Sequence, residues 1–356
     1  MQGSTSRQVA LEKLKSNPDN VELSYLPREF VLANLPHKDS EAREWVRENG
    51  KFTLRMRRSD GENSPRLPFG CIPRLVVAWL TTEAGKRDDR LIKIPGTMSA
   101  FLRALRLDKK TGWGVRGDCK RLKEQLTRLF AVRIDFEWSD EFAAADGKDS
   151  MDMQIAPGAV IWFESERQGQ ECWIELSEQF HAVITRSRVP FDQRAMQVLK
   201  RNRLATDVYM MITKRIQALQ LDGKSGADIP LTSLEEQFGS SYARHRNFRA
   251  ALREAIDMIK VVYPAIGAEV MRWALRIKAT KLPVPAMSKD KAAVAAAGVS
   301  KDRLGPRIRV WFNDTFPGAN YGQVEAKFKG WLQAREIVPH DIGALFKSQA
   351  GKILSG

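Results

Sequence analysis

Residues 242–263 read YARHRNFRAALREAIDMIKVVY, and this stretch decides the fold. Placed on a helix, its apolar residues form one continuous stripe, made of Phe248, Leu252, Ala255, Ile256 and Ile259. A stripe of this width is typical of a helix that buries one side against a protein core. We therefore predict an amphipathic helix over most of Tyr242–Tyr263.

The second face of this helix is basic. Arg246, Arg249 and Arg253 share it by their spacing, and Arg244 and His245 lie in the entry turn. A helix that presents arginines opposite its buried side fits the major groove of DNA, where Arg reaches phosphates and guanine edges. A solvated charged face is the alternative interpretation of the same pattern.

The segments around this helix follow a recognisable order. Upstream are a helix candidate, Phe191–Leu219, and the short segment Ile229–Leu234, from which a short helix runs to Phe238. Thr232 is expected to cap that helix, with Glu235 completing a capping box. Helix, short strand, helix, basic helix and basic strand is the order of a winged-helix domain.

The basic strand is predicted because apolar residues recur at every second position over residues 271–277. Met271, Trp273, Leu275 and Ile277 are expected to face the core, with Trp273 more a core residue than a base-stacking platform. Arg272 and Arg276 fall on the opposite face, where we expect them to contact the DNA backbone.

The first half of the chain repeats this order. We predict a buried helix over Arg74–Leu80, a short strand over Arg90–Ile94 and a short amphipathic helix over Thr97–Leu107. A basic helix over Arg116–Arg133 follows, and then strands over Val132–Trp138, Val160–Phe163 and Cys172–Leu176. The outward face of the basic helix carries Arg116, Lys120, Lys123 and Thr127. Ile94-Pro95-Gly96-Thr97 and Ile229-Pro230-Leu231-Thr232 stand at equivalent points of the two halves, which favours tandem modules.

The segment Ile184–Arg203 joins the two modules and is strongly basic. Its Arg186 and Arg188 lie either in solvent or on DNA phosphates, and the sequence favours neither.

Several short stretches resemble one known family. They are residues 67–84 (LPFGCIPRLVVAWLTTEA), Phe101–Leu105, Arg128–Phe130, Val189–Asp192, Phe238–Tyr242, Phe248–Arg249 and Val262–Pro264. In this order they resemble the RepA family of bacterial plasmid replication proteins, over roughly Arg66–Pro283. The resemblance implies an initiator built from tandem winged helices. Such a protein binds repeated sites, called iterons, in double-stranded plasmid origin DNA and helps host replication proteins to open it.

The same resemblance implies partners. One is a second copy of the chain, because related initiators form dimers that dissociate before they bind iterons as monomers. The others are host initiator and helicase proteins. The nearest alternative function is a winged-helix transcriptional repressor without initiator activity. RNA binding is supported by charge alone, since no aromatic stacking motif of the usual RNA modules is present.

Composition is consistent with this interpretation. The 356-residue chain has 58 Lys and Arg against 43 Asp and Glu, a net charge of +15, which favours a polyanionic partner. Three scattered cysteines, no long apolar run and no signal-peptide pattern predict a reduced, cytoplasmic bacterial protein without a membrane segment.

No enzyme motif is complete. Gly112–Gly117 matches G-x-G-x-x-G but follows a polar segment instead of a buried strand, and Gly223-Lys224-Ser225 lacks the first glycine of a P-loop, where Ala218 stands. No His-x-His metal pair is present. We predict no enzymatic activity, no cofactor and no metal.

The predicted fold class is α+β, with tandem winged-helix domains and a small helical C-terminal module. The predicted boundaries are 1–64 for an N-terminal arm or accessory segment, 65–183 and 184–283 for the two winged-helix domains, 284–300 for a linker and 301–356 for a small basic helical module.

Overall fold

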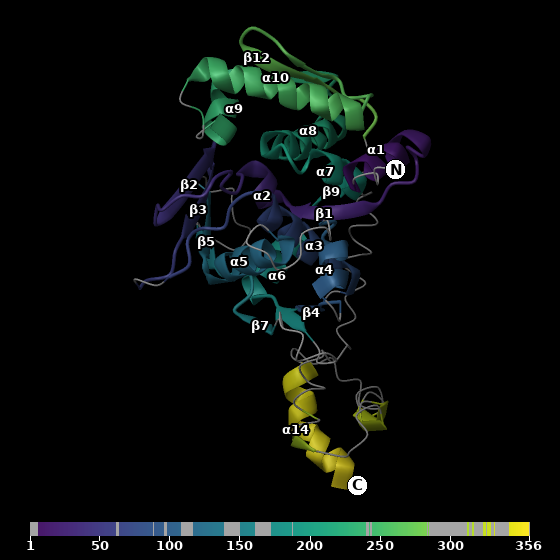
Figure 1. The fold of residues 1–356 in the computed structure, drawn as a ribbon. Helices are drawn as coiled ribbons and strands as arrows, with labels where there is room; N and C mark the ends of the chain where they lie inside the picture. Colours follow the sequence, from purple (N-terminus) through teal and green to yellow (C-terminus); the bar gives the residue numbers. More distant parts are fainter. Residues whose placement is uncertain are drawn as a thin grey trace. The chain divides into compact units, whose positions relative to one another are not determined.

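The structure is a computed structural model, and its chain divides into two compact units, Met1–Ala286 and Met287–Gly356. It describes residues 6–61, 64–87, 89–95, 98–107, 117–138, 150–160, 172–186, 188–239, 242, 244–282 and 284, and, in the second unit, 312, 315–316, 323–324, 326–328, 331 and 342–355. Helices and strands are mixed along the first unit, so the predicted α+β class is confirmed (Figure 1).

The part of the chain from residue 203 to 278 contains three helices and a three-stranded antiparallel sheet. In chain order its elements are α8 (Arg203–Leu221), β10 (Gly226–Pro230), α9 (Leu231–Phe238), α10 (His245–Val262), β11 (Ala268–Val270) and β12 (Ala274–Lys278). The last strand lies in the middle of the sheet, because β12 pairs with both β10 and β11. Leu275 of β12 stands opposite both Ile229 and Val270.

Residues 71–175 contain the same arrangement. Its elements are α3 (Cys71–Arg87), β4 (Leu91–Lys93), α4 (Met98–Ala104), α5 (Asp118–Ala131), β7 (Gly158–Val160) and β8 (Trp173–Glu175). Here too the last strand, β8, pairs antiparallel with both others. The two halves therefore share one order of elements and one order of strands.

A four-stranded antiparallel sheet combines two strands that precede the first of these halves with two strands that lie within it. It is formed by β2 (Glu44–Asn49), β3 (Phe52–Arg57), β5 (Arg133–Trp138) and β6 (Ser150–Met153), in that order. Phe52, Leu54 and Met56 alternate inward on β3 and are buried. The strand predicted over Val132–Trp138 is confirmed, but it pairs with β3 and β6 and not with β7 or β8. Residues 150–153 form β6, a strand that is absent from the elements predicted above.

The N-terminal residues belong to the same core as both halves. The elements concerned are α1 (Ser6–Ser16), β1 (Leu23–Pro27), α2 (Arg28–Leu32), α6 (Glu178–Arg186), β9 (Arg188–Asp192) and α7 (Gln193–Leu199). β1 pairs antiparallel with β9 over five residues. Residues 6–57, predicted to be an arm or accessory layer, thus supply two helices and three strands that pack inside the first unit.

Two buried arginines tie these layers together. Arg194 on α7 makes a bidentate ion pair with Asp192, and its guanidinium also donates to the carbonyls of Asn17 and Pro18 after α1. Arg74 on α3 pairs with Asp207 on α8, with Nε–Oδ1 and Nη2–Oδ2 distances of 2.8 Å each. The first helices of the two halves are therefore joined directly by a buried ion pair.

The predicted amphipathic helix is confirmed as α10. Phe248, Leu252, Ala255, Ile256 and Ile259 are at most 2 % exposed, and α10 packs against α8. The capping box predicted for α9 is wrong. Pro230 precedes that helix and no side chain caps it, while the Glu235 carboxylate contacts His245 instead.

The second unit has a small aromatic core. Phe312, Phe328 and Phe346 are fully buried, and Trp331 stacks on Phe328 with ring centroids 5.9 Å apart. Its helix α14 (Ile342–Ser355) lies within residues 301–356, which were predicted to form a small helical module. In the described part of the chain, no helix is long and apolar enough to cross a membrane.

Candidate nucleic-acid interface

The basic face of α10 is accessible. Arg244, Arg246 and Arg253 are exposed, and Arg249 is half-buried. The opposite stripe is fully buried, so the helix cannot rotate without exposing Phe248 and Leu252. The guanidiniums of this face are long, flexible donors that reach phosphates and base edges.

The connection between β11 and β12 lies beside this face. It contains residues 271–273 and is closed by the Met271 amide, which donates to the Ala274 carbonyl at 2.8 Å. Trp273 is 67 % exposed, so its predicted place in the core is wrong. The regular alternation begins only at Ala274, where β12 starts, and Trp273 therefore belongs to the turn of the hairpin.

Trp273 connects the hairpin with the helix. Its ring lies 5.0 Å from the Arg272 guanidinium and 5.7 Å from that of Arg249 on α10. Cation–π contacts of this length orient guanidiniums without neutralising their charge. The sequence pattern placed Trp273 on the buried face of the strand, because the apolar alternation runs without a break from Met271 to Ile277.

Two other predicted contact residues are already paired with carboxylates. The His245 ring contacts Glu235 through Nδ1. Arg276 makes a bidentate ion pair with Asp228 across β12 and β10, with both N–O distances at 2.9 Å. This pair raises the pKa of Arg276 and lowers that of Asp228. Arg276 faces solvent as predicted, but part of its charge is compensated by Asp228.

Three of the four residues predicted on the outward face of the basic helix in the first half are exposed there. Lys120, Lys123 and Thr127 are exposed on α5, where they line a shallow groove with Arg66. The Thr127 hydroxyl donates to the Lys123 carbonyl at 3.0 Å. Arg116 lies outside the described residues. Arg66 was not predicted, because it precedes the first apolar segment and shares no periodicity with α5.

Arg186 and Arg188 differ in their surroundings. Arg186 is exposed in the last turn of α6. Arg188 is half-buried, and its guanidinium lies 4.6 Å from the ring of Tyr25. It also lies against Gly85 of α3, where an added Cβ would come within 1.7 Å of Arg188 Nη1. Arg188 therefore packs inside the protein, whereas Arg186 is available to a partner.

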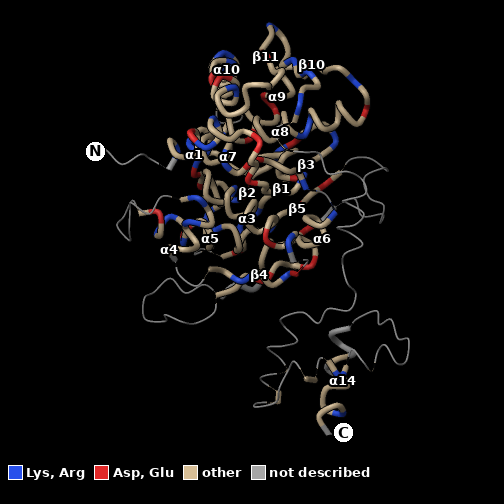
Figure 2. The backbone as a smooth tube through the Cα atoms, turned by 90° about the vertical axis from the view of Figure 1, so that its right-hand side faces the viewer, with Lys and Arg blue, Asp and Glu red and all other residues tan. Residues whose placement is uncertain are grey.

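Lys and Arg are distributed over many elements of the first unit, with Asp and Glu between them (Figure 2). In that view α10 lies at the top of the unit, and α5 lies in its lower part. The two basic faces therefore belong to different parts of the unit.

Residues 67–229 match the model of the RepA_C family, which is described as plasmid encoded RepA protein. Over these residues the chain is similar to that family. The resemblance to RepA proteins predicted from the sequence is thereby confirmed, over α3 to β10. The matched region ends at Ile229, so α9, α10 and the β11–β12 hairpin follow it.

Two solved structures are similar to this one. Both contain domains 2 and 3 of RctB, one as selenomethionine derivatives. The selenomethionine structure is 10 % identical to this chain, with a TM-score of 0.44, and the match covers 73 % of this chain and 99 % of that one. For the second structure the identity is 8 % and the TM-score 0.40, and the match covers 75 % of this chain and 99 % of that one. Similarity at this level says nothing about function. No curated protein sequence matches the chain.

Proposed function

We propose that this protein is a plasmid replication initiator that binds double-stranded origin DNA at iterons. The similarity to the RepA_C family supports a role in replication. The observation that carries the DNA-binding part is the exposed arginine face of α10, held by a fully buried stripe next to the exposed Trp273 and Arg272. We expect no enzymatic activity of the initiator itself.

The repeated topology supports a tandem winged-helix interpretation. In each half a basic helix comes third, and the final strand lies between the two others in the sheet. In winged-helix proteins the third helix enters the major groove, and the strands after it contact the neighbouring backbone. On this basis α10 and α5 are the two recognition helices, and the β11–β12 hairpin is the wing of the second domain.

Arg246 is the best candidate for a base-edge contact, because it is exposed and no carboxylate contact is found for it in the described part of the chain. Arg249 is held against Trp273 and is expected to act with it. Arg276, paired with Asp228, is expected to contribute less to phosphate binding than an unpaired arginine would. Dimerisation, and contacts with host initiator and helicase proteins, belong to the proposal as consequences of the family resemblance.

The experiment is a set of binding isotherms on iteron and scrambled duplexes. Arg246→Ala and Arg249→Ala should each cost roughly 1–3 kcal/mol on the iteron and much less on scrambled DNA. Trp273→Ala should weaken iteron binding, and Trp273→Phe should retain most of it, since a ring still holds the two guanidiniums.

A suitable control is Lys224→Ala, which removes an exposed cation that lies next to Asp222 and away from α10. If Arg246→Ala and Arg249→Ala leave the ratio of iteron to scrambled affinity unchanged, α10 is not the recognition helix.

A further inference from the structure

The two candidate recognition helices are carried by two different helices of the core. In the first half α5 packs against α3, and in the second half α10 packs against α8. The distance and angle between the two basic faces therefore depend on how α3 is held against α8. A buried ion pair joins these two helices, between Arg74 of α3 and Asp207 of α8.

The Arg74–Asp207 pair is directional. Both N–O distances are 2.8 Å, and the two side chains are 6 % and 11 % exposed. A bidentate pair requires the planar guanidinium and the carboxylate to lie edge to edge. A rotation of α8 relative to α3 therefore breaks at least one of the two bonds and leaves buried charge poorly compensated. His37 adds a further contact, because its Nε2 lies 2.7 Å from the Asp207 oxygen that Arg74 Nη2 also contacts.

The guanidinium of Arg74 is also held from the side of α5. Its Nη1 donates to the Gly70 carbonyl at 2.6 Å, and the amide of the preceding residue, Phe69, donates to Gln125 Oε1 of α5 at 2.9 Å. Gly70 has a φ of +82°, a conformation that favours glycine, so the turn between these two contacts has a defined shape. Arg74 thus has a fixed orientation relative to α5 on one side and to Asp207 on the other.

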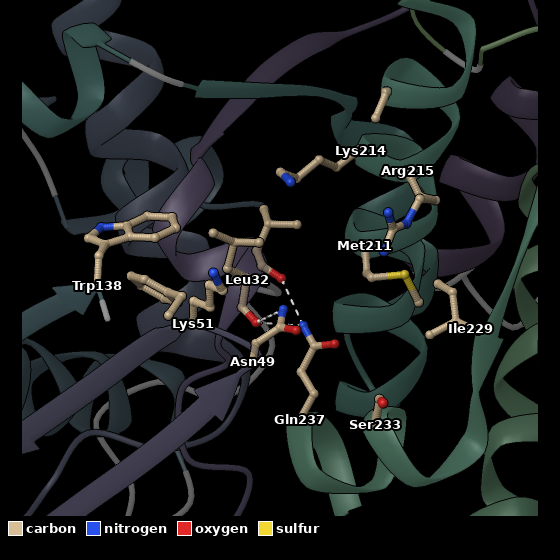
Figure 3. Close-up of a pocket in the computed structure, with 13 residues that line it drawn as sticks. Leu32, Asn49, Lys51, Trp138, Met211, Lys214, Arg215, Ile229, Ser233 and Gln237 are labelled. Carbon is tan, nitrogen blue, oxygen red and sulfur yellow. Dashed lines mark hydrogen bonds between the residues drawn. The ribbon is translucent and has the colours of Figure 1, made fainter. Parts of the chain in front are cut away.

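Packing between the halves does not fix this orientation by itself. A pocket of about 270 Å³ separates α8, α9 and β10 from the β2–β3 hairpin and the end of β5 (Figure 3). Beside it the Leu32 carbonyl accepts from Gln237 of α9 at 2.5 Å and from Asn49 of β2 at 2.8 Å, as Figure 3 shows. Close packing resists rotation only where atoms are in contact. The orientation of the halves therefore depends on such directional contacts, and the Arg74–Asp207 pair is the one that joins α3 to α8.

We propose that the Arg74–Asp207 pair is a positioning contact that sets the spacing of the two half-sites that the protein accepts, where a half-site is the part of one iteron contacted by α5 or by α10. The inference rests on the proposed function, in which these helices are the two recognition helices. Two linked binding modules strengthen each other only when their geometry lets both bind at once. Both side chains are buried, so they act on DNA through α5 and α10 and not by touching it.

A shift of the half-sites by one base pair is large compared with the tolerance of this pair. One inserted base pair moves the half-sites apart by about 3.4 Å and rotates them by about 35° around the DNA axis. The wild-type chain then binds with one recognition helix or gives up the ion pair, and its affinity should fall roughly tenfold or more. Asp207→Ala releases α8 from α3, so the same insertion should weaken its binding only about threefold or less.

The test compares the dissociation constants of the full chain for two duplexes, measured by fluorescence anisotropy well below the unfolding midpoint. One duplex has a base pair inserted at the centre of the iteron footprint, and the other has a base-pair substitution there and the original length. Asp192→Ala is the matched control. It also removes a buried carboxylate from a bidentate pair with an arginine, Arg194, but that pair joins β9 to α7. Asp192→Ala should destabilise the fold and keep the wild-type ratio of the two dissociation constants.

A second variant keeps the test decisive if Asp207→Ala does not fold. Arg74→Met combined with Asp207→Leu leaves no unpaired charge and should remain folded, yet without the directional pair it should tolerate the insertion. The inference is overturned if either variant rejects the inserted duplex as strongly as the wild-type chain does. It is also overturned if Asp192→Ala tolerates the insertion as Asp207→Ala does, or if the wild-type chain binds both duplexes equally. A wild-type chain that does not bind iterons at all refutes the proposed function itself, and this inference with it.

Discussion

Replacement of Asp207 by Ala tests whether the two halves of the first unit are held together by charge. Asp207 accepts hydrogen bonds from Arg74 Nε and Nη2 and lies 2.7 Å from His37 Nε2. Arg74 is 5 % exposed, so the substitution leaves its charge inside the protein without a counter-ion. Removing one partner of a buried ion pair costs about 3–5 kcal/mol.

The structure places Asp207→Ala at the lower end of that range. Arg74 still donates to the carbonyls of Leu35 and Gly70, both at 2.6 Å, so its hydrogen bonds are only partly lost. We therefore expect a loss of about 3 kcal/mol. For a unit of this size, roughly 2 °C of midpoint temperature corresponds to 1 kcal/mol, and the unfolding midpoint should fall by about 6 °C.

The assay is thermal unfolding followed by circular dichroism, with Asp228→Ala as the control. Asp228 also pairs bidentately with an arginine, Arg276, but both side chains are about half exposed, so little change in the midpoint is expected. The double variant Arg74→Met with Asp207→Leu should lose less than the sum of the two single variants, because no unpaired charge remains. A midpoint for Asp207→Ala equal to that of Asp228→Ala, or strict additivity in the double variant, would refute the reasoning.

Three further expectations concern pH, salt and catalysis. Burial lowers the pKa of His37 below its ordinary value of 6.5. Just below pH 6.5, His37 is therefore protonated in the unfolded chain but neutral in the folded chain, and acidification favours unfolding. The unfolding midpoint should therefore fall as pH drops from 7 to 5, and His37→Asn should reduce this slope; a midpoint that rises on acidification contradicts it. Asp228→Ala leaves Arg276 free to contact DNA phosphates, so the slope of log K for DNA binding against log salt concentration should become steeper by up to about one. Arg276→Ala should change this slope by less than one, because Asp228 already compensates part of the charge of Arg276. The purified protein should neither hydrolyse ATP nor nick supercoiled origin DNA with Mg²⁺, and nicking that disappears when one tyrosine is replaced would contradict an initiator without enzymatic activity.

The sequence predicted local features well where one pattern dominates. The stripe of α10 has the period of a helix over its whole length, and no other element competes for its apolar residues. The same holds for α5 and for the alternating residues of β5. In contrast, the helix expected over Phe191–Leu219 is divided. Arg188–Asp192 form β9, and Asn202 caps a new helix by accepting from the Ala205 amide at 3.0 Å.

What the sequence could not predict are pairings between distant residues. Nothing near Val189 indicates that β9 pairs with β1, and nothing near Asp135 indicates that β5 pairs with β3. The same is true of the partners of single charges. Arg276 was expected to be free for DNA, but Asp228 stands opposite it only because β10 and β12 are aligned in that register. Trp273 was misplaced because alternation cannot show where a strand begins.

The pairing of β1 with β9 also bears on how the chain is made. Leu23 of β1 pairs with Asp192 of β9, which is synthesised 169 residues later. At translation rates of about 5–20 residues per second, roughly 10–30 s pass between the synthesis of β1 and that of its partner strand. During that time the backbone donors and acceptors of Leu23–Pro27 are unpaired, and the apolar residues around Phe30 lack most of the core that later covers them. The nascent chain is thus a substrate for chaperones that hold the emerging N-terminal segment, and synonymous codons that slow synthesis before residue 192 should lower the yield of soluble protein.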